Sequence, residues 1–470
     1  MNHPRIVWLR RDLRLADHAA LAAAAAAGPV IVAYVLDDAG AGQRKLGSAS
    51  RWWLHHSLAA LAQELESRGQ RLILRRGDAA QEIAALAAET GATEVHAIRH
   101  YEPWWRAAEV ALAARVTLRL HNGNYLSPPG QVLTGGGQPY KIFTPFYRAA
   151  LEQLPPPPPL PVPPMAAPSV WPRSDELGGW QLLPTAPDWA GGMRKAWQPG
   201  EAAAADRLGT FLDRVGKYET ARNLPSIDGS SRFSPHLHWG EISPATAWHA
   251  LDSHEGDGHM GECKDGEGVT SFRRELVWRD FAQTVIAQFP EYGEQNYRCE
   301  YNRLGWRDPA TDKAAAADLL AWQQGRTGYP IVDAGMRQLW TMGWMHNRVR
   351  MITASFLIKH LLIDWREGER WFWDTLVDAD YGSNSVNWQW VSGSGVDASL
   401  FSRIMAPLVQ SPKFDAAGYI REWVPELAGL ADPDIHDPVF RPAGYPAQVV
   451  GHKQARERAL AAYRRAKSTA

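Results

Sequence analysis

The segment SFRRELVWRDFAQ carries a carboxylate, an indole and a guanidinium at helical spacing. Positions i, i+3, i+4 and i+7 hold Glu275, Trp278, Arg279 and Ala282. A helix would place these side chains on one face, where a core-facing stripe would carry Leu or Val. Such a face could bind a ligand by hydrogen bonding and stacking. The alternative is an amphipathic helix edge with a Glu–Arg pair.

A second segment, GWMHNRVRMITASFL, sets an amide among apolar residues. One helical face would carry Trp344, Asn347, Met351 and Ala354, with Arg350 at its flank. An Asn inside an apolar helix competes with the backbone for hydrogen bonds, and it is tolerated where its side chain bonds a ligand or water. Spacing alone leaves a structural role and a binding role equally open.

A third segment, LVDADYGSNSVNWQW, combines polar and aromatic side chains. It holds two carboxylates, an amide and two indoles: Asp378, Asp380, Asn384, Trp388 and Trp390. Gly382 and the Ser/Asn cluster predict a loop. Buried carboxylates need partners, and Asp378 could pair with Arg350. Because paired acids are common structural features, this pair alone indicates no function.

A fourth segment, GSSRFSPHLHWG, could bind a phosphate. The hydroxyls of Ser230, Ser231 and Ser234 surround Arg232, although a plain turn explains them equally well. No short phosphate-loop, dinucleotide or nucleophile-elbow fingerprint occurs in the chain. His236-x-His238 lacks further ligands, so we expect no metal. The chemistry therefore has to come from a cofactor held without a standard fingerprint.

The bulk composition limits the partners and the compartment. Fifty Lys and Arg oppose 51 Asp and Glu in 470 residues, a net charge of −1, so a nucleic-acid surface would be a local patch. Cys263 and Cys299 form no disulfide framework, which favours a reducing, cytoplasmic location. The uncharged run Ala19–Leu36 is broken by Gly28-Pro29 and is not expected to span a membrane. The 22 tryptophans could fill a core, form stacking surfaces or relay electrons.

The first 126 residues alternate strand and helix patterns. The expected strands are Arg5–Leu9, Val30–Leu36, Arg71–Leu74, Glu94–Ile98 and Val116–Leu120. Between them lie an Ala-rich helix that Asp17 can cap, a helix over Ser50–Arg68, one capped by Asp78 and one near Pro103–Ala113. This alternation predicts a doubly wound α/β domain with a parallel sheet.

The rest of the chain divides into a linker and a helical region. Residues 127–200 are rich in Pro and Gly and predict an extended linker, in which PYKIFTPFYR (Pro139–Arg148) should pack against something. Residues 201–470 predict a larger, mostly α domain. Its expected helices include Phe272–Phe289, Ala314–Gln324, Asp333–Met342, Met345–Ile363 and Arg370–Leu376. The stretch Gly256–Gly268 is expected to be a solvated connection.

The four segments, in this order, resemble the photolyase and cryptochrome family. VWLRRDLRLADHAAL and PYKIFTPFYR match it as well, and the resemblance is densest from Tyr218 to Lys413. GWMHNRVRM and NWQWVSGSGVDA look like the class I cyclobutane-dimer photolyases. The six-four photolyases and animal cryptochromes typically have His where Asn347 stands, and WMW in place of Trp388-Gln389-Trp390.

The resemblance implies a folded FAD in the helical domain. Its cofactor contacts would come from Tyr218, Ser230, Ser231, Ser234, Arg279, Asn347, Arg350, Asp378, Asp380 and Asn384. Asn384 would lie beside flavin N5 and favour the reduced, anionic flavin. Phe272 and Tyr381-Gly382-Ser383 depart from the family pattern, which puts the flavin environment in doubt.

The resemblance also implies the residues that handle DNA and electrons. The catalytic residues would be Glu275, Asn384, Asn347 and Met351. The residues contacting DNA or the lesion would be Arg222, Glu275, Trp278, Arg348 and Trp390. The electron-transfer chain would be Trp306, Trp365 and Trp388.

The implied function is light-dependent repair. A deoxyribodipyrimidine photo-lyase splits cyclobutane pyrimidine dimers by electron transfer from photoexcited reduced FAD to the flipped-out lesion. The α/β domain would hold an antenna, methenyltetrahydrofolate or a deazaflavin. Glu102 lies near a glutamate that folate-binding members use, although a surface acid is the simpler interpretation. UV-damaged DNA is the expected partner of a monomer that needs no protein partner and no membrane.

Two rival functions belong to the same family. A cryptochrome-like photoreceptor would bind FAD without repair, but cryptochromes often carry long C-terminal extensions, and this sequence stops soon after the last motif. Asn347 argues against a six-four photolyase. A non-enzymatic nucleic-acid module would leave Asn384 and the tryptophan chain unexplained.

Overall fold

The protein folds into two compact units in a computed structural model that describes residues 3–256, 266–398 and 400–468. The first unit comprises Met1–Trp189, Ala196–Gly216 and Arg232–Pro290. The second comprises Ala190–Lys195, Lys217–Ser231 and Glu291–Ala470. Both units are discontinuous in sequence, whereas the domains expected at 1–126, 127–200 and 201–470 are continuous stretches.

The first unit contains a five-stranded parallel sheet. Its strands are β1 (Arg5–Leu9), β2 (Val30–Leu36), β3 (Leu72–Arg76), β4 (Glu94–Ile98) and β5 (Thr117–His121). They lie in the order β3-β2-β1-β4-β5, with every pair parallel. The predicted doubly wound sheet is confirmed. The strand order reverses at β1, so the carboxyl ends of β1 and β4 border the position where such sheets bind ligands.

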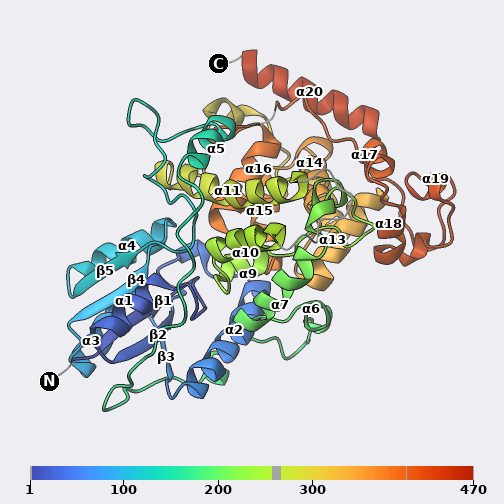
Figure 1. Ribbon diagram of the computed structural model, residues 1–470. Helices are drawn as coiled ribbons and strands as arrows, with labels where there is room; N and C mark the ends of the chain where they lie inside the picture. The colour runs from blue at the N-terminus through green and yellow to red at the C-terminus, as the bar shows by residue number, and fades with distance from the viewer. Residues whose placement is uncertain (1–2, 257–265, 399, 469–470) are drawn as a thin grey trace. The chain divides into compact units, whose positions relative to one another are not determined.

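Helices cover both faces of this sheet (Figure 1). They are α1 (Ala19–Ala27), α2 (Ser48–Ser67), α3 (Ala79–Thr90) and α4 (Pro103–Ala113). Side chains from α3 and α4, including Ile83 and Trp105, share one buried cluster with Ile6 and Trp8 of β1. On the other face, α1 packs against β1, β4 and β5. The nearly continuous apolar strands follow from burial on both faces.

One of the two predicted helix caps in this region is wrong. Asp78 does cap α3, because its side chain accepts a hydrogen bond from the Gln81 N–H at 2.8 Å. The cap of α1 is His18, whose Nδ1 accepts from the Leu21 N–H at 3.1 Å. Asp17 takes a positive φ of 47° and instead accepts a hydrogen bond from the Leu160 N–H at 3.1 Å. Its carboxylate thus holds the proline-rich segment.

Residues 127–189 of the first unit are mostly irregular but packed. They include α5 (Phe143–Leu151) and a 3₁₀ turn at Leu177–Trp180. Phe143 and Phe146 of α5 are buried against Phe281 of α11 (Glu267–Gln288). The prediction that PYKIFTPFYR packs against the protein is confirmed.

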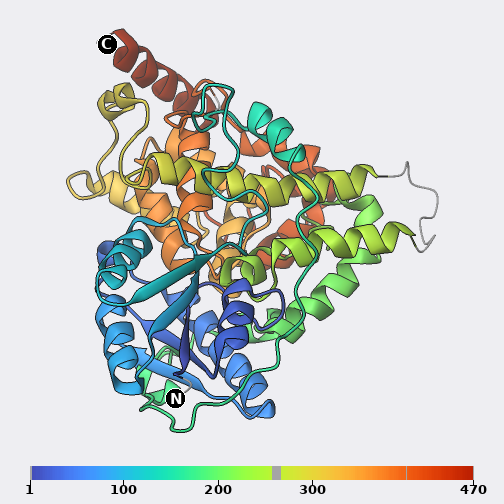
Figure 2. The same ribbon diagram turned by 60° about the vertical axis from the view of Figure 1, so that its left-hand side comes forward.

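The remaining helices of the first unit are α7 (Glu201–Leu212), α9 (Ser234–Trp239), α10 (Pro244–Gly256) and α11. Figure 2 shows α10 and α11 side by side, and their residues are in contact. The connection expected over Gly256–Gly268 falls largely on residues 257–265, outside the described residues. The expected helix over Phe272–Phe289 is confirmed within α11.

The second unit is helical, and its described residues form no strand. Its helices include most of α6 (Gly191–Ala196), α8 (Tyr218–Ala221), α12 (Lys313–Gln323), α13 (Pro330–Met342), α14 (Asn347–Ser355), a π-helical turn (Phe356–His360), α15 (Trp365–Thr375), α16 (Tyr381–Ser392), α17 (Pro407–Lys413), α18 (Ala417–Trp423), α19 (Asp432–Ile435) and α20 (His452–Ser468). The buried helix α13 packs against α12, α14 and α18. Among the described residues, no helix is long and apolar enough to cross a membrane.

Candidate functional site

Helix α11 of the first unit presents the predicted stripe. Glu275, Trp278 and Arg279 are each half-buried, while Ala282 is buried. The Arg279 guanidinium donates to the Leu237 carbonyl at 3.0 Å and lies 5.4 Å from the Tyr125 ring centroid. Contacts within the first unit therefore fix the Arg279 side chain. The carboxylate of the stripe belongs to Glu275.

The Trp278 indole lies flat against an aromatic ring of α5. Its centroid is 3.4 Å from that of Phe143, with an interplanar angle of 8°. Phe281 meets the indole edge-on at 5.7 Å. One face of the indole is therefore occupied, so a stacked ligand would use the other face. Phe272 is buried against Phe211 at 4.6 Å and belongs to the core of this unit.

Helix α14 of the second unit begins later than the sequence pattern indicated. The spacing predicted a helix from Met345, but the first helical residue is Asn347. His346 caps it, because its Nδ1 accepts from the Arg348 N–H at 3.3 Å. Asn347 is therefore exposed at a helix start, and the expected competition of a mid-helix Asn with the backbone does not arise. Trp344 precedes the helix, so it does not share a helical face with Met351.

Arg350 and Asp378 form the predicted ion pair. The two guanidinium NH groups donate to the two carboxylate oxygens at 3.2 and 2.9 Å. The Arg350 Nε–H also donates to the Met345 carbonyl at 2.7 Å. This bidentate geometry fixes Asp378, whose side chain is buried, and leaves Arg350 with few donors for another ligand.

The segment predicted as a loop around Gly382 is helix α16. Asp380 caps it, because its Oδ1 accepts from the Ser383 N–H at 2.6 Å. The cap compensates for the weak helix propensity of Gly, Ser and Asn. Asn384 and Trp388 then lie one turn apart, and both are buried.

The Asn384 amide is held by a residue that the sequence analysis missed. Its Nδ2 donates to the Glu369 Oε1 at 2.8 Å and to the Glu369 carbonyl at 3.2 Å. Glu369 lies on α15 and is fully buried. Within the part of the chain that the structure describes, the Asn384 Oδ1 accepts no hydrogen bond. The amide oxygen of Asn384 can therefore accept a hydrogen bond from a ligand. A buried Glu gives no signal in sequence periodicity.

Tyr218, Arg222 and the first two serines lie in the second unit. Tyr218 is buried on α8, and the Arg222 guanidinium lies 5.1 Å from its ring centroid. A Cβ added at Gly229 would lie 2.3 Å from the Ala221 carbonyl oxygen, so the segment leading to Ser230 and Ser231 folds tightly onto α8. Ser234 begins α9 of the first unit.

The remaining DNA and electron-transfer candidates are also in the second unit. The Arg348 Nε–H donates to the Asn223 Oδ1 at 2.7 Å. The Trp365 Nε1–H donates to the Asn296 Oδ1 at 2.8 Å, and its ring is fully buried. Trp388 is buried, whereas Trp306 and Trp390 are half-buried. The Trp388 indole packs on the α15 backbone, since a Cβ at Gly368 would lie 2.2 Å from it.

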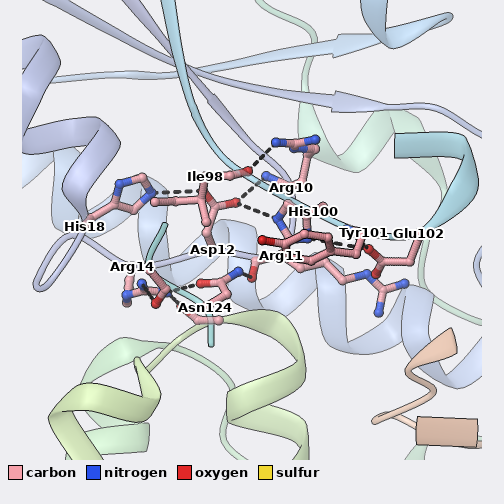
Figure 3. Close-up of polar contacts among 12 residues, drawn as sticks. Arg10, Arg11, Asp12, Arg14, His18, Ile98, His100, Tyr101, Glu102 and Asn124 are labelled. Carbon is pink, nitrogen blue, oxygen red and sulfur yellow. Dashed lines mark hydrogen bonds and ion pairs between the residues drawn. The ribbon is translucent and has the colours of Figure 1, made fainter. Parts of the chain in front are cut away.

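A buried polar network lies beyond the carboxyl ends of β1 and β4 (Figure 3). The Asp12 carboxylate lies between two imidazoles, 3.0 Å from the His18 Nε2 and 3.9 Å from the His100 Nε2. Burial alone would raise the pKa of Asp12, but these two histidines outweigh it and leave the pKa lowered. On the far side of His100, the Glu102 carboxylate lies 3.8 Å from its Nδ1. Glu102 is buried, so the alternative of a surface acid is wrong.

A small pocket lies beside this network in the first unit. Four aromatic side chains line it, together with residues at and after the carboxyl end of β2. The full lining is Arg11, Tyr34, Leu36, Asp37, Ala41, Arg44, Leu46, Trp104, Trp105 and Trp239. The Arg11 guanidinium lies 5.2 Å from the Trp239 ring centroid. Aromatic walls with two guanidinium groups suit a flat, anionic conjugated ligand.

Comparisons with known proteins agree along the whole chain. A family described as DNA photolyase matches residues 5–164, and the FAD binding domain of DNA photolyase matches residues 272–465. The deoxyribodipyrimidine photo-lyase of Agrobacterium fabrum is 47% identical, covering 99% of this chain and 98% of its own. Cryptochrome-2 of Arabidopsis thaliana is 35% identical over 93% of this chain and 73% of its own.

A solved structure gives the same result. The crystal structure of a bacterial class III photolyase from Agrobacterium tumefaciens has a TM-score of 0.92 and 47% identity. The match covers 100% of this chain and 98% of that chain. Class I, which the sequence motifs favoured, is not specified by these comparisons.

Proposed function

We propose that this chain, which belongs to the DNA photolyase family, repairs cyclobutane pyrimidine dimers in UV-damaged DNA under light. The observation that carries the proposal is the buried Asn384 amide, oriented by Glu369 within the segment that matches the FAD binding domain. An amide held through its NH₂ group offers its oxygen to a ligand N–H. Flavin N5 carries a hydrogen only in the reduced ring, so this orientation favours reduced FAD.

The chemistry of the other side chains fits FAD. The Arg350–Asp378 pair holds a carboxylate in a fixed orientation in the second unit. Tyr218, Ser230 and Ser231 would supply hydroxyls to the phosphates and the ribityl chain. Asp380 and Asn347 of the same unit would add further polar contacts. When bound, reduced FAD would supply the photoexcited electron that opens the cyclobutane ring and would receive it back.

The lesion-binding residues would act by stacking and hydrogen bonding. Enzymes that carry out chemistry on a base, photolyases included, generally extrude that base from the duplex. Trp278 and Trp390 would stack on the extruded bases, a contact worth roughly 1–3 kcal/mol per base. Glu275 would hydrogen-bond the pyrimidines and could share a proton with them. Asn347 and Met351 would line the lesion pocket.

Backbone contacts and electron supply would use further residues. Arg222 and Arg348 would bind phosphates, giving an affinity that depends on salt but little on sequence. Trp388, Trp365 and Trp306 would conduct electrons toward the buried cofactor during its reduction. Trp388 and Trp365 are buried, whereas Trp306 is half-buried. This order, from the more exposed ring to the buried ones, supports the proposed direction of electron transfer.

The aromatic pocket beside β2 would hold the antenna chromophore. Trp104, Trp105 and Trp239 would stack on it, and Arg11 and Arg44 would bind its charged groups. Methenyltetrahydrofolate and a deazaflavin both satisfy this chemistry. An action spectrum of repair after reconstitution with each pigment would distinguish them, and a spectrum unchanged by either would refute the antenna site.

Repair of a defined thymine-dimer oligonucleotide tests the proposal. The reduced protein should restore thymine under blue light and not in darkness. Glu275→Ala and Trp278→Ala should lose most of this activity while retaining flavin. If a flavin-loaded protein repairs nothing in the light, the chain is a photoreceptor, the alternative supported by its 35% identity to a cryptochrome.

We propose that the enzyme acts as a monomer on cytoplasmic DNA.

A further inference from the structure

Helix α5 lies along α11 within the first unit. It buries Phe143, Phe146 and Ala150, which stand at positions i, i+3 and i+7. These residues belong to the proline-rich stretch that follows the parallel sheet, and none of them is among the binding residues proposed above. Of the three, Phe143 makes the flat contact with the Trp278 indole at 3.4 Å.

The stack continues beyond Phe143. The Tyr147 ring lies on it at 5.6 Å between centroids, with an interplanar angle of 28°. The Arg274 guanidinium lies 5.5 Å from the Phe143 centroid and 5.7 Å from that of Tyr147. Three rings and a cation therefore form one aromatic cluster, in which the Trp278 indole is half-buried.

A further ring, Phe281, contacts this cluster edge-on. Phe281 contacts Phe143 at 5.7 Å and 73°, and it contacts Trp278 at 5.7 Å and 79°. Both Phe143 and Phe281 are buried. Throughout the described residues, these two are the only rings that contact the Trp278 indole. The face of the indole opposite Phe143 thus carries no aromatic neighbour.

We propose that Phe143 is a positioning residue for lesion recognition, which holds the Trp278 indole as a rigid stacking platform. This inference rests on the proposed function. A ring already fixed on one face loses little side-chain freedom when a base stacks on the other. Immobilising a free side chain costs enough to weaken binding about threefold to tenfold. Helix α5 therefore contributes to discrimination between damaged and undamaged DNA.

Substitutions on α5 separate positioning from packing. Phe143→Leu removes the stacked ring but keeps an apolar side chain, and Phe143→Tyr restores the ring. Phe146→Leu is the matched control, because Phe146 is buried on the same helix and packs on Phe281 at 5.4 Å without a ring contact to Trp278. The measurement is the ratio of dissociation constants for undamaged and dimer-containing oligonucleotides, on the full-length flavin-loaded protein.

The expected result is specific to Phe143. Phe143→Leu should lower the ratio about threefold to tenfold through weaker lesion binding, with the affinity for undamaged DNA unchanged. Phe143→Tyr and Phe146→Leu should keep the wild-type ratio. Phe143→Leu should cause no further loss in a Trp278→Ala background, because the two rings act as one unit.

Three results would overturn the inference. They are equal ratios for Phe143→Leu and Phe146→Leu, failure of Phe143→Tyr to restore the ratio, and additive losses with Trp278→Ala. If Phe143→Leu does not fold, Phe143→Met, a flexible side chain of similar volume, decides by the same criteria. A wild-type protein that neither discriminates nor repairs dimers would instead refute the proposed function.

Discussion

Glu369 determines which way the Asn384 amide faces. Its carboxylate accepts the Nδ2–H at 2.8 Å, so the amide oxygen is the atom left for a ligand. Both side chains are buried, where an unpaired amide is costly, and the pair therefore has one favoured arrangement. A flipped amide would offer a donor and would favour a flavin without a hydrogen at N5.

Substitution of Glu369 tests this orientation. Glu369→Leu should leave the Asn384 amide held only by its longer hydrogen bond to the backbone carbonyl of residue 369 and lower light-dependent repair by up to about tenfold, since a lost hydrogen bond costs roughly 0.5–1.5 kcal/mol. Glu369→Gln can still accept through its amide oxygen and should retain most activity. The readouts are initial repair rate and the absorbance spectrum of bound flavin. Equal activities in the two variants would contradict the orienting role.

The sequence carried some of these residue-level features and not others. The Arg350–Asp378 pair was predictable because a buried carboxylate needs an opposite charge. The Glu369–Asn384 bond was not, because its partners lie on separate helices whose contact no periodicity encodes. His346 as the cap of α14 was also missed, and this error placed Asn347 inside a helix instead of at its start.

At the scale of elements, α16 is a helix that depends on the residue that caps its N-terminus. Gly382, Ser383 and Asn384 are poor helix formers, which is why the sequence predicted a loop there. The Asp380 side chain satisfies the Ser383 N–H at 2.6 Å, and the buried side chains after it pack the helix into the second unit. Tertiary packing and one cap therefore override local propensity.

Removal of this cap should be measurable. Asp380→Ala should destabilise the protein by about 1 kcal/mol, whereas Asp380→Asn, which can still cap, should be close to wild type. Urea denaturation of the flavin-free protein separates this effect from any contact of Asp380 with the cofactor. An Asp380→Ala protein as stable as Asp380→Asn would show that packing alone maintains α16.

The strands were predicted more accurately than the helix ends. Arg5–Leu9, Val30–Leu36 and Glu94–Ile98 match the observed strands residue for residue. Each of these strands is a short apolar run bounded by turn residues, so the sequence marks where it begins and ends. Helix ends depend on caps such as His18 and His346, which are less usual cap residues than Asp or Ser.

At the scale of the whole molecule, the two units are built from interleaved stretches of chain. Composition marked residues 127–200 as a linker, but the side chains of α5 and Asp17 hold part of this stretch within the first unit. Contacts between residues distant in the chain decide such boundaries, and a single sequence does not reveal them. The family domains match residues 5–164 and 272–465, so α5 falls inside the first of them and residues 165–271 lie between the two.

A buried acid makes stability depend on pH. Asp280 is fully buried, and burial raises its pKa from 3.8 to about 7, although the Ser127 N–H donates to its Oδ2 at 2.6 Å. A raised folded-state pKa gives stability that is complete below the unfolded pKa and is lost as pH rises through the folded one. The loss falls between about pH 4 and pH 7 and amounts to roughly 4 kcal/mol.

Asp280→Asn should remove this dependence. The amide resembles the protonated acid and does not ionise. The free energy of unfolding of the variant, relative to that of the wild type, should therefore increase between about pH 5 and pH 8. Unfolding free energies from urea titrations at both values provide the comparison. A difference between the two proteins that is the same at both pH values would mean that Asp280 ionises normally in the folded state.

Multiple turnover of a dimer-containing oligonucleotide tests the central claim most directly. The protein, loaded with reduced FAD and kept without oxygen or added reductant, is illuminated with an excess of substrate, and restored thymine is counted per protein molecule. Because the electron returns after each repair, the account predicts many dimers repaired per protein in the light and none in the dark. Repair that stops at one dimer per flavin, or that proceeds equally in darkness, would contradict it.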